Sequence, residues 1–243
     1  MAYNFLGLVN DINRRLNEVE LTSSNFAAAT GFYSQAKDAV NASIRYMNQS
    51  EYEWPFNHVE QEDVLTVGVT RYVFPVDCKV IDFDTFRIKE DTTLGNGTVK
   101  LPIISYEEYL DKYVEQEYNS TSRQGVPQLV AHGPALEYIL TPEPDAAYTV
   151  VYEYYRVPVD LELYDDVPAV PERFKHVVVD GAMHYAYLFR GNSQDALIAK
   201  EKYQEGIKNM RSMLINRTYY VRSYMIPQNT GGGGRMGYAR LPI

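Results

Sequence analysis

The spacing of apolar residues changes twice along this chain of 243 residues, and the order of these changes restricts its possible folds. Apolar residues recur every three or four positions up to residue 50 and again from residue 171, the period of a helix face. From residue 51 to about 160, short β-branched and aromatic runs are separated by turn residues. The order predicts an α+β fold: a bundle of long helices from the N- and C-terminal parts, with a central antiparallel β domain.

The same pattern predicts three units along the chain. Residues 1–50 and 171–216 form a helical domain, and residues 51–170 form the antiparallel β domain. Residues 217–243, which contain four consecutive glycines, form an extended C-terminal arm.

Two helices are expected in the first fifty residues. Thr22, Ser23 or Ser24 supplies the N-cap of the second helix, because a short side-chain oxygen can accept from the free amides at a helix start. Each helix needs a neighbouring helix or subunit to cover its apolar stripe. The first stripe is Phe5, Leu8, Val9, Ile12, Leu16 and Val19, and the second is Phe26, Ala29, Tyr33, Ala36, Val40, Ile44 and Met47.

The first half of the β region contains two pairing signals. Residues 64–67 and 69–74 are strand-like runs on either side of Gly68 and predict a hairpin-like pair. Gly95, Asn96 and Gly97 are a turn sequence, and they predict pairing of residues 87–89 with residues 99–101.

The second half of the β region begins with a short helix over residues 105–113. Ser105 is its expected N-cap, and Glu107 and Glu108 suit the positive end of the helix dipole. Three strands follow and predict an antiparallel meander: residues 128–131, 135–140 and 148–157.

Two helices are expected after residue 170. Pro171 is placed at the first position of a helix that runs to Phe189 and ends at Gly191. Asn192 or Ser193 caps the next helix. Its apolar face is Ala196, Ala199, Tyr203, Ile207, Met210 and Leu214.

The C-terminal 27 residues differ from the rest in charge. They hold four arginines and no acidic residue, so their charge of +4 leaves −13 for residues 1–216 of a chain whose net charge is −9. Tyr, Met and Arg, which are abundant here, are enriched at protein interfaces. We therefore expect an arm that binds a partner, with a frayed terminus as the alternative. Its expected contact residues are Arg222, Tyr224, Met225, Arg235, Tyr238, Arg240 and Leu241.

Composition narrows the possible settings and partners. The negative charge argues against specific binding to nucleic acid. Cys78 is the single cysteine, so no intrachain disulfide can form, and a reducing compartment is expected. No apolar run is long enough to cross a bilayer, and the first residues lack the features of a signal peptide, so no membrane association is expected.

Catalytic and metal-binding patterns are weak throughout the sequence. It contains no P-loop, GxSxG, HExxH or CxxC pattern, and we expect no enzyme activity, cofactor or metal. His176 and His184 with Asp180 are more typical of packed side chains than of ligands. Asp165 and Asp166 could serve acid–base chemistry or hold a cation, but such a pair more often sets a turn.

Tyrosines are unusually frequent, with 22 in the chain. Tyr152, Tyr154 and Tyr155 with Trp54 could form an aromatic platform for sugar binding. The alternation along the strand favours another interpretation, in which Val150, Tyr152 and Tyr154 share a face that packs into a core.

Four stretches of the sequence belong together as one pattern. They are residues 49–56; residues 67–75 with 82–88; residues 125–128 with 140–145 and 148–155; and residues 165–171 with 177–182. In this order they resemble the head-to-tail adaptor proteins of short-tailed bacteriophages, the group that includes tail tubular protein A. The resemblance covers residues 1–216 and leaves out the glycine-containing tail.

The resemblance implies a structural virion protein, made in the host cytoplasm and located in the tail or neck. It implies a homo-oligomeric ring of about twelve copies that joins the portal protein to the tail nozzle protein. Genomic DNA would pass through the ring without specific binding, which the acidic composition suits. The alternatives are a tail tube or nozzle component, or a Tyr-rich carbohydrate-binding or lytic tail module.

Overall fold

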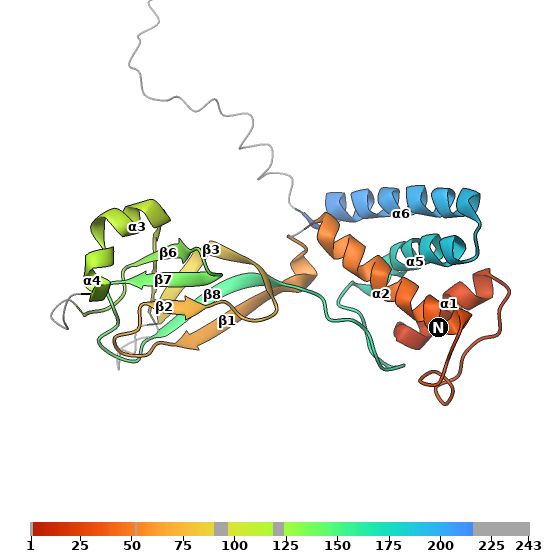
Figure 1. The fold of residues 1–243 in the computed structure, drawn as a ribbon, viewed down its shortest axis with the longest axis horizontal. Coiled ribbons are helices and arrows are strands. Elements are labelled where there is room, and N and C mark those ends of the chain that lie inside the picture. The colour runs from red at the N-terminus through yellow and green to blue at the C-terminus, as the bar shows by residue number, and fades with distance from the viewer. Residues whose placement is uncertain (1, 52, 90–96, 119–123, 216–243) are drawn as a thin grey trace, which may run out of the picture.

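The fold has a helical part and a β part that lie next to each other along its longest dimension (Figure 1). The computed structural model describes residues 2–51, 53–89, 97–118 and 124–215. The helical part is built from both ends of this described chain, and the β part is built from the residues between them. The predicted α+β class is confirmed, while the exact domain limits stay a prediction.

Four helices share one apolar core. The helix α5 packs against α1, α2 and α6, and α1 also packs against α2. The side chains at the centre of this core, which include Val40, Met47 and Tyr203, are almost fully buried. The four helices are α1 (Phe5–Arg15), α2 (Phe32–Ser50), α5 (Lys175–Phe189) and α6 (Ser193–Leu214).

Three of these helices meet at Gly181 of α5. A Cβ at this position would lie 2.3 Å from the Ser43 hydroxyl of α2 and 2.7 Å from the Tyr203 ring of α6. The Ser43 hydroxyl donates to the Val178 carbonyl at 2.9 Å, and the Tyr203 hydroxyl donates to the Ser43 carbonyl. Glycine thus allows an approach that places these hydrogen bonds between helices distant in sequence.

The two C-terminal helices agree with the sequence prediction. The Asn192 side chain accepts from the Asp195 amide at the start of α6. Gly191 separates the two helices with a φ of 74°. The predicted start at Pro171 is wrong, because Pro171 comes before a short 3-10 turn, η3 (Glu172–Phe174), and α5 begins only at Lys175. The expected face of α6 is buried, apart from the half-buried Leu214.

The N-terminal helices are shorter than predicted. Val19 lies beyond α1 and is 74% exposed. Gly31, with a φ of 63°, comes immediately before α2, so the residues 22–24 do not cap this helix. Phe26 is still buried, with its ring 5.1 Å from that of Phe5, but it reaches the core from a turn. The apolar spacing thus predicted correctly that Phe26 is buried, but it wrongly placed Phe26 in a helix.

The β part consists of two four-stranded sheets. One has the order β1-β8-β3-β4 and is antiparallel; the other has the order β2-β7-β6-β5, with β5 and β6 parallel. The first contains β1 (His58–Val64), β8 (Thr149–Arg156), β3 (Cys78–Lys89) and β4 (Thr98–Lys100). The second contains β2 (Arg71–Val73), β7 (Glu137–Thr141), β6 (Leu129–Gly133) and β5 (Ile103–Ile104).

Two short helices complete the β part. They are α3 (Tyr106–Lys112) and α4 (Val114–Tyr118). The Ser105 hydroxyl accepts from the Glu108 amide, as predicted for the start of α3. Tyr109 of α3 packs against Ala131 and Ile139 and covers one side of the second sheet.

Strand order differs from the prediction in three ways. The expected hairpin around Gly68 does not form, because β1 and β2 belong to different sheets. The expected meander forms only in part: β6 and β7 pair antiparallel as predicted, but β8 leaves them to pair with β1 and β3. The predicted β domain was wholly antiparallel, whereas the second sheet is mixed, because β5 and β6 pair in parallel. Pairing of β3 with β4 is confirmed, while the turn residues 95 and 96 lie outside the described residues.

Strand β8 crosses to the first sheet because its inward side chains fill the core between the sheets. The ring of Tyr152 stacks on that of Phe86 with centroids 4.7 Å apart. Asp63 of β1 accepts from the Tyr152 hydroxyl at 2.8 Å and from the Tyr138 hydroxyl of β7 at 2.9 Å. Burial, together with the Asp63 carboxylate, raises the pKa of both phenols above its usual range. One carboxylate thus joins the two sheets.

Val40→Asp is expected to destabilise the helical part. Val40 is fully buried in α2, and the substitution places an unpaired charge in the helical core. We expect the free energy of unfolding to fall by several kcal/mol, roughly the largest effect of a single substitution. A melting temperature equal to that of the unaltered protein would show that the core is wrongly placed.

Asp63→Ala is expected to weaken the junction between the sheets. It leaves two buried tyrosine hydroxyls without their acceptor, which costs about 2–4 kcal/mol in total. Chemical denaturation measures this loss. Asp84→Ala is the matched control, because the Asp84 side chain is 82% exposed. Equal stabilities of the two variants would contradict the proposed junction.

Candidate interaction surface

Residues 157–171 lead from the end of β8 to η3 without forming a helix or strand. We call this segment the return loop, because it brings the chain back to the helical part (Figure 1). It carries four acidic residues and no lysine or arginine. The acidic residues are Asp160, Glu162, Asp165 and Asp166.

One side of the return loop is fixed to α2. Asn41 donates from its amide nitrogen to the Leu161 carbonyl and accepts from the Leu161 amide, both at 3.0 Å. The side chains of Leu161, Pro168 and Val170 are buried against the helices. The Asn41 side chain thus pairs with both backbone groups of Leu161, as a residue of a neighbouring strand would.

The other end of the loop is fixed to the start of the chain. The Phe5 amide donates to the Asp166 carbonyl at 2.8 Å, and the Leu6 amide donates to the Tyr164 carbonyl at 3.0 Å. These two amides belong to the first turn of α1, where no intrahelical acceptor is available. The return loop supplies hydrogen-bond acceptors for these two amides, and the same hydrogen bonds position the loop.

Asp166 also shapes the loop from within. One of its carboxylate oxygens accepts from the Glu162 and Leu163 amides, each at 2.7 Å. This is the turn-setting role predicted for the Asp165–Asp166 pair, and Asp166 performs it. The Asp165 side chain is exposed.

The outward side of the loop is apolar and acidic. Val159 is 82% exposed, Leu163 is 63% exposed and Val167 is 62% exposed. Glu162 and Asp165 are exposed between them, and within the described ranges neither carboxylate has an ion-pair partner. Several exposed apolar side chains on one loop, beside acidic ones, are typical of a surface that contacts another protein.

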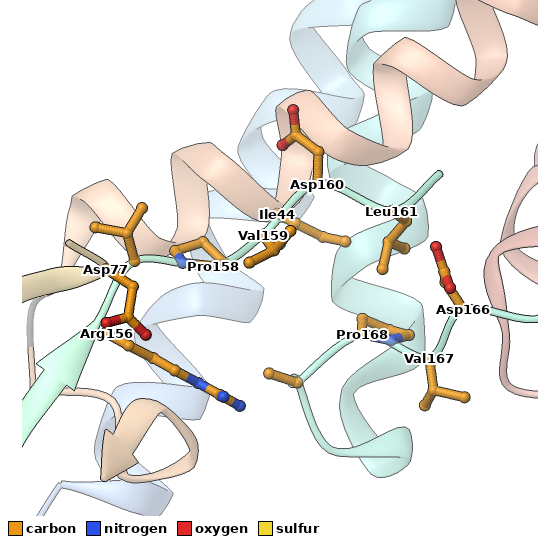
Figure 2. A pocket seen from close by; sticks show the side chains of 12 residues that line it. Ile44, Asp77, Arg156, Pro158, Val159, Asp160, Leu161, Asp166, Val167 and Pro168 are labelled. Atoms are coloured by element: carbon orange, nitrogen blue, oxygen red, sulfur yellow. The ribbon is translucent and has the colours of Figure 1, made fainter. Parts of the chain in front are cut away.

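A hollow of about 340 Å³ lies between the return loop and α2. Figure 2 shows Ile44 of α2 at its back, with Val159 and Leu161 on one side and Val167 and Pro168 on the other. The residues that line it are Ile44, Asp77, Arg156, Val157, Pro158, Val159, Asp160, Leu161, Asp166, Val167, Pro168 and Ala169.

The charged groups at the rim of this hollow are already partly paired. Arg45 makes two hydrogen bonds to the Asp160 carboxylate, of 2.8 and 2.6 Å, and these lower the pKa of Asp160. Asp77 accepts from the Tyr154 hydroxyl at 2.9 Å, and burial followed by this bond raises the pKa of Tyr154 to about 12. The lining of the hollow thus contains three carboxylates, those of Asp77, Asp160 and Asp166, and the guanidinium of Arg156.

The candidate residues for chemistry and sugar binding lie apart from this surface. His184 Nδ1 is 2.8 Å from the Ala196 carbonyl, which joins α5 to α6. Trp54 is fully buried and donates to the Met47 carbonyl at 2.9 Å, while Tyr152 is buried between the sheets. The aromatic sugar platform is therefore wrong. Across the described residues, no three histidine, cysteine or acidic side chains gather as a metal site.

The predicted arm contacts lie outside the described residues. They are Arg222, Tyr224, Met225, Arg235, Tyr238, Arg240 and Leu241. The return loop itself was missed by sequence reasoning. Its signal was present as valines and leucines that alternate with acids between Pro158 and Pro168, where no strand was expected.

None of the helices in the described ranges is long and apolar enough to span a membrane. Comparison with protein families gives one match, to the family described as SU10 adaptor protein, over residues 3–228. No curated protein is significantly similar to the chain. The match covers both parts of the fold and the return loop.

Asn41→Ala is expected to release the return loop without unfolding the helices. The variant loses both hydrogen bonds to Leu161, which costs about 1–3 kcal/mol. Hydrogen exchange of residues 159–164 should become faster by at least roughly tenfold, while that of α6 is unchanged. Gln49→Ala, at an exposed site of α2, is the control. Unchanged exchange in the loop would show that Asn41 does not hold it.

Proposed function

The chain belongs to the SU10 adaptor protein family and is a structural phage adaptor protein, and on this basis we propose that it forms a head-to-tail adaptor ring. In this proposal identical copies join the portal protein to the tail nozzle protein, as the adaptors related to tail tubular protein A do. The observation that carries the proposal is the family match over residues 3–228.

A ring requires two different faces of each copy to meet. The structure offers candidates for both faces. One is the return loop, with its exposed apolar side chains. Another is the outer side of α5 and α6, where Leu188, Phe189, Leu197 and Ile198 are each at least half exposed. We propose that helices of adjacent copies pack there and extend the four helices into a larger bundle.

The charge of the chain suits a channel wall. Residues 1–216 carry a net charge of −13, and such a surface repels phosphates. DNA can then pass along the ring without being held. This supports the proposed position of the ring around the path of the genome.

The extended arm is proposed to contact the portal. Arg222, Arg235 and Arg240 would pair with acidic groups there, and Tyr224, Met225, Tyr238 and Leu241 would fill apolar pockets. The family match ends at residue 228, before the four glycines. The first half of the arm, residues 217–228, therefore lies within the family match, and its tip, residues 235–243, lies beyond it.

Truncation after Asn216 tests this proposal. The shortened chain should keep its helical circular-dichroism signal, because the four-helix core lies within residues 5–214. It should fail to join portal-containing capsids in a sedimentation assay, because the arginines and tyrosines of the arm are lost. Capsids that bind the truncated and full chains equally well would refute the role of the arm.

A further inference from the structure

We propose that the hollow beside the return loop binds residues 217–225 of a second copy of this chain. This inference rests on the proposed ring and names one of its contacts. Arg222, Tyr224 and Met225 would then contact a neighbouring copy in place of the portal, and the tip beyond the four glycines would remain available to the portal.

The walls of the hollow are held in place in an isolated copy, before any segment binds. Its walls are held by the Asn41 bonds to Leu161 and by the first turn of α1. A fixed surface loses little conformational entropy when a segment binds. Val159 and Val167 are exposed on either side of the hollow, so a bound apolar side chain would cover both.

The chemistry of residues 217–225 matches this surface. The segment contains Arg217 and Arg222, three tyrosines and Met225, and it has no acidic residue. A hollow of about 340 Å³ can take a tyrosine or methionine side chain. The return loop supplies four acidic residues and no basic one. Arg156 also lines the hollow, so the complementary charge comes from the exposed carboxylates of the loop, and the apolar match comes from Val159 and Val167.

Two carboxylates on the loop are available for the arginines. Asp160 is held by Arg45, and Asp166 accepts from backbone amides. Glu162 and Asp165 are exposed, and the described residues provide no ion pair to either. They lie on the outward side together with Leu163, where an approaching segment would meet them first.

The proposed ring favours a second copy over the same copy as the source of the bound segment. Figure 1 shows α6 and the return loop on opposite sides of α5. The end of α6 is fixed near the end of α2, because Arg211 donates to the Ser50 carbonyl at 3.1 Å and pairs with Glu51 at 2.8 Å. In a ring, two different faces of adjacent copies meet, so residues 217–225 of one copy would reach the hollow of the next.

Photo-crosslinking in the full chain tests this directly. Tyr224 is replaced by benzoylphenylalanine in ¹⁵N-labelled protein, which is mixed with unlabelled protein and assembled on portals. Mass spectrometry should find crosslinks from the labelled arm to unlabelled peptides that contain residues 157–171. Crosslinks confined to one copy, or directed to another surface, would overturn the inference.

Charge reversal gives a second measurement. Glu162→Lys combined with Asp165→Lys should lower the crosslink yield by about tenfold, because the loop then repels the arginines. Glu107→Lys combined with Asp111→Lys on the exposed side of α3 is the matched control and should leave the yield unchanged. Equal yields from both double variants would overturn the inference.

Electron microscopy of the same samples separates this inference from the proposed function. Rings on portals with no crosslink to residues 157–171 refute the inference alone. Absence of rings on portals refutes the proposed function, and the inference with it. Rings with the expected crosslinks support both.

Discussion

The close approach of three helices at Gly181 is the constraint from which the rest of the arrangement follows. It brings α2, from the start of the chain, into contact with α5 and α6, from the end of the described chain. The β part therefore has to leave and rejoin the helices at one side (Figure 1). The return loop is the segment that makes this connection, and its path along α2 and α1 is set by the helices it must reach.

The return loop combines a fixed backbone with an exposed apolar face. Its inward residues Leu161 and Val170 stabilise the helical core, while Val159, Leu163 and Val167 remain in water in an isolated copy. Exposed apolar area of this kind favours association, and a subunit of a ring gains free energy by covering it. In the proposed ring, the same segment would close the fold of one copy and contact the next. Membership of an adaptor family agrees with this use.

Helix positions were predictable where they depend on one apolar face or one capping residue. The face of α6, its Asn192 cap and the Ser105 cap of α3 follow from spacing and side-chain type. Strand order was not predictable. Alternation along β8 indicates which of its residues are buried, but it does not indicate which sheet the strand joins. That depends on contacts between residues far apart in sequence, such as those of Asp63 with Tyr138 and Tyr152. Phe26 was predicted as buried but not as part of a turn, since Gly31 interrupts the helix. The arm was predicted from charge, and its residues lie outside the described ones.

The central claim is that many copies of this chain form one layer between the portal and the tail. Cryo-electron microscopy of the phage neck, reconstructed without imposed symmetry, tests it most directly. We expect a closed ring of identical densities that fit the helical and β parts, directly below the portal and around the DNA. A single copy at the vertex, or a ring at another position in the tail, would contradict the claim.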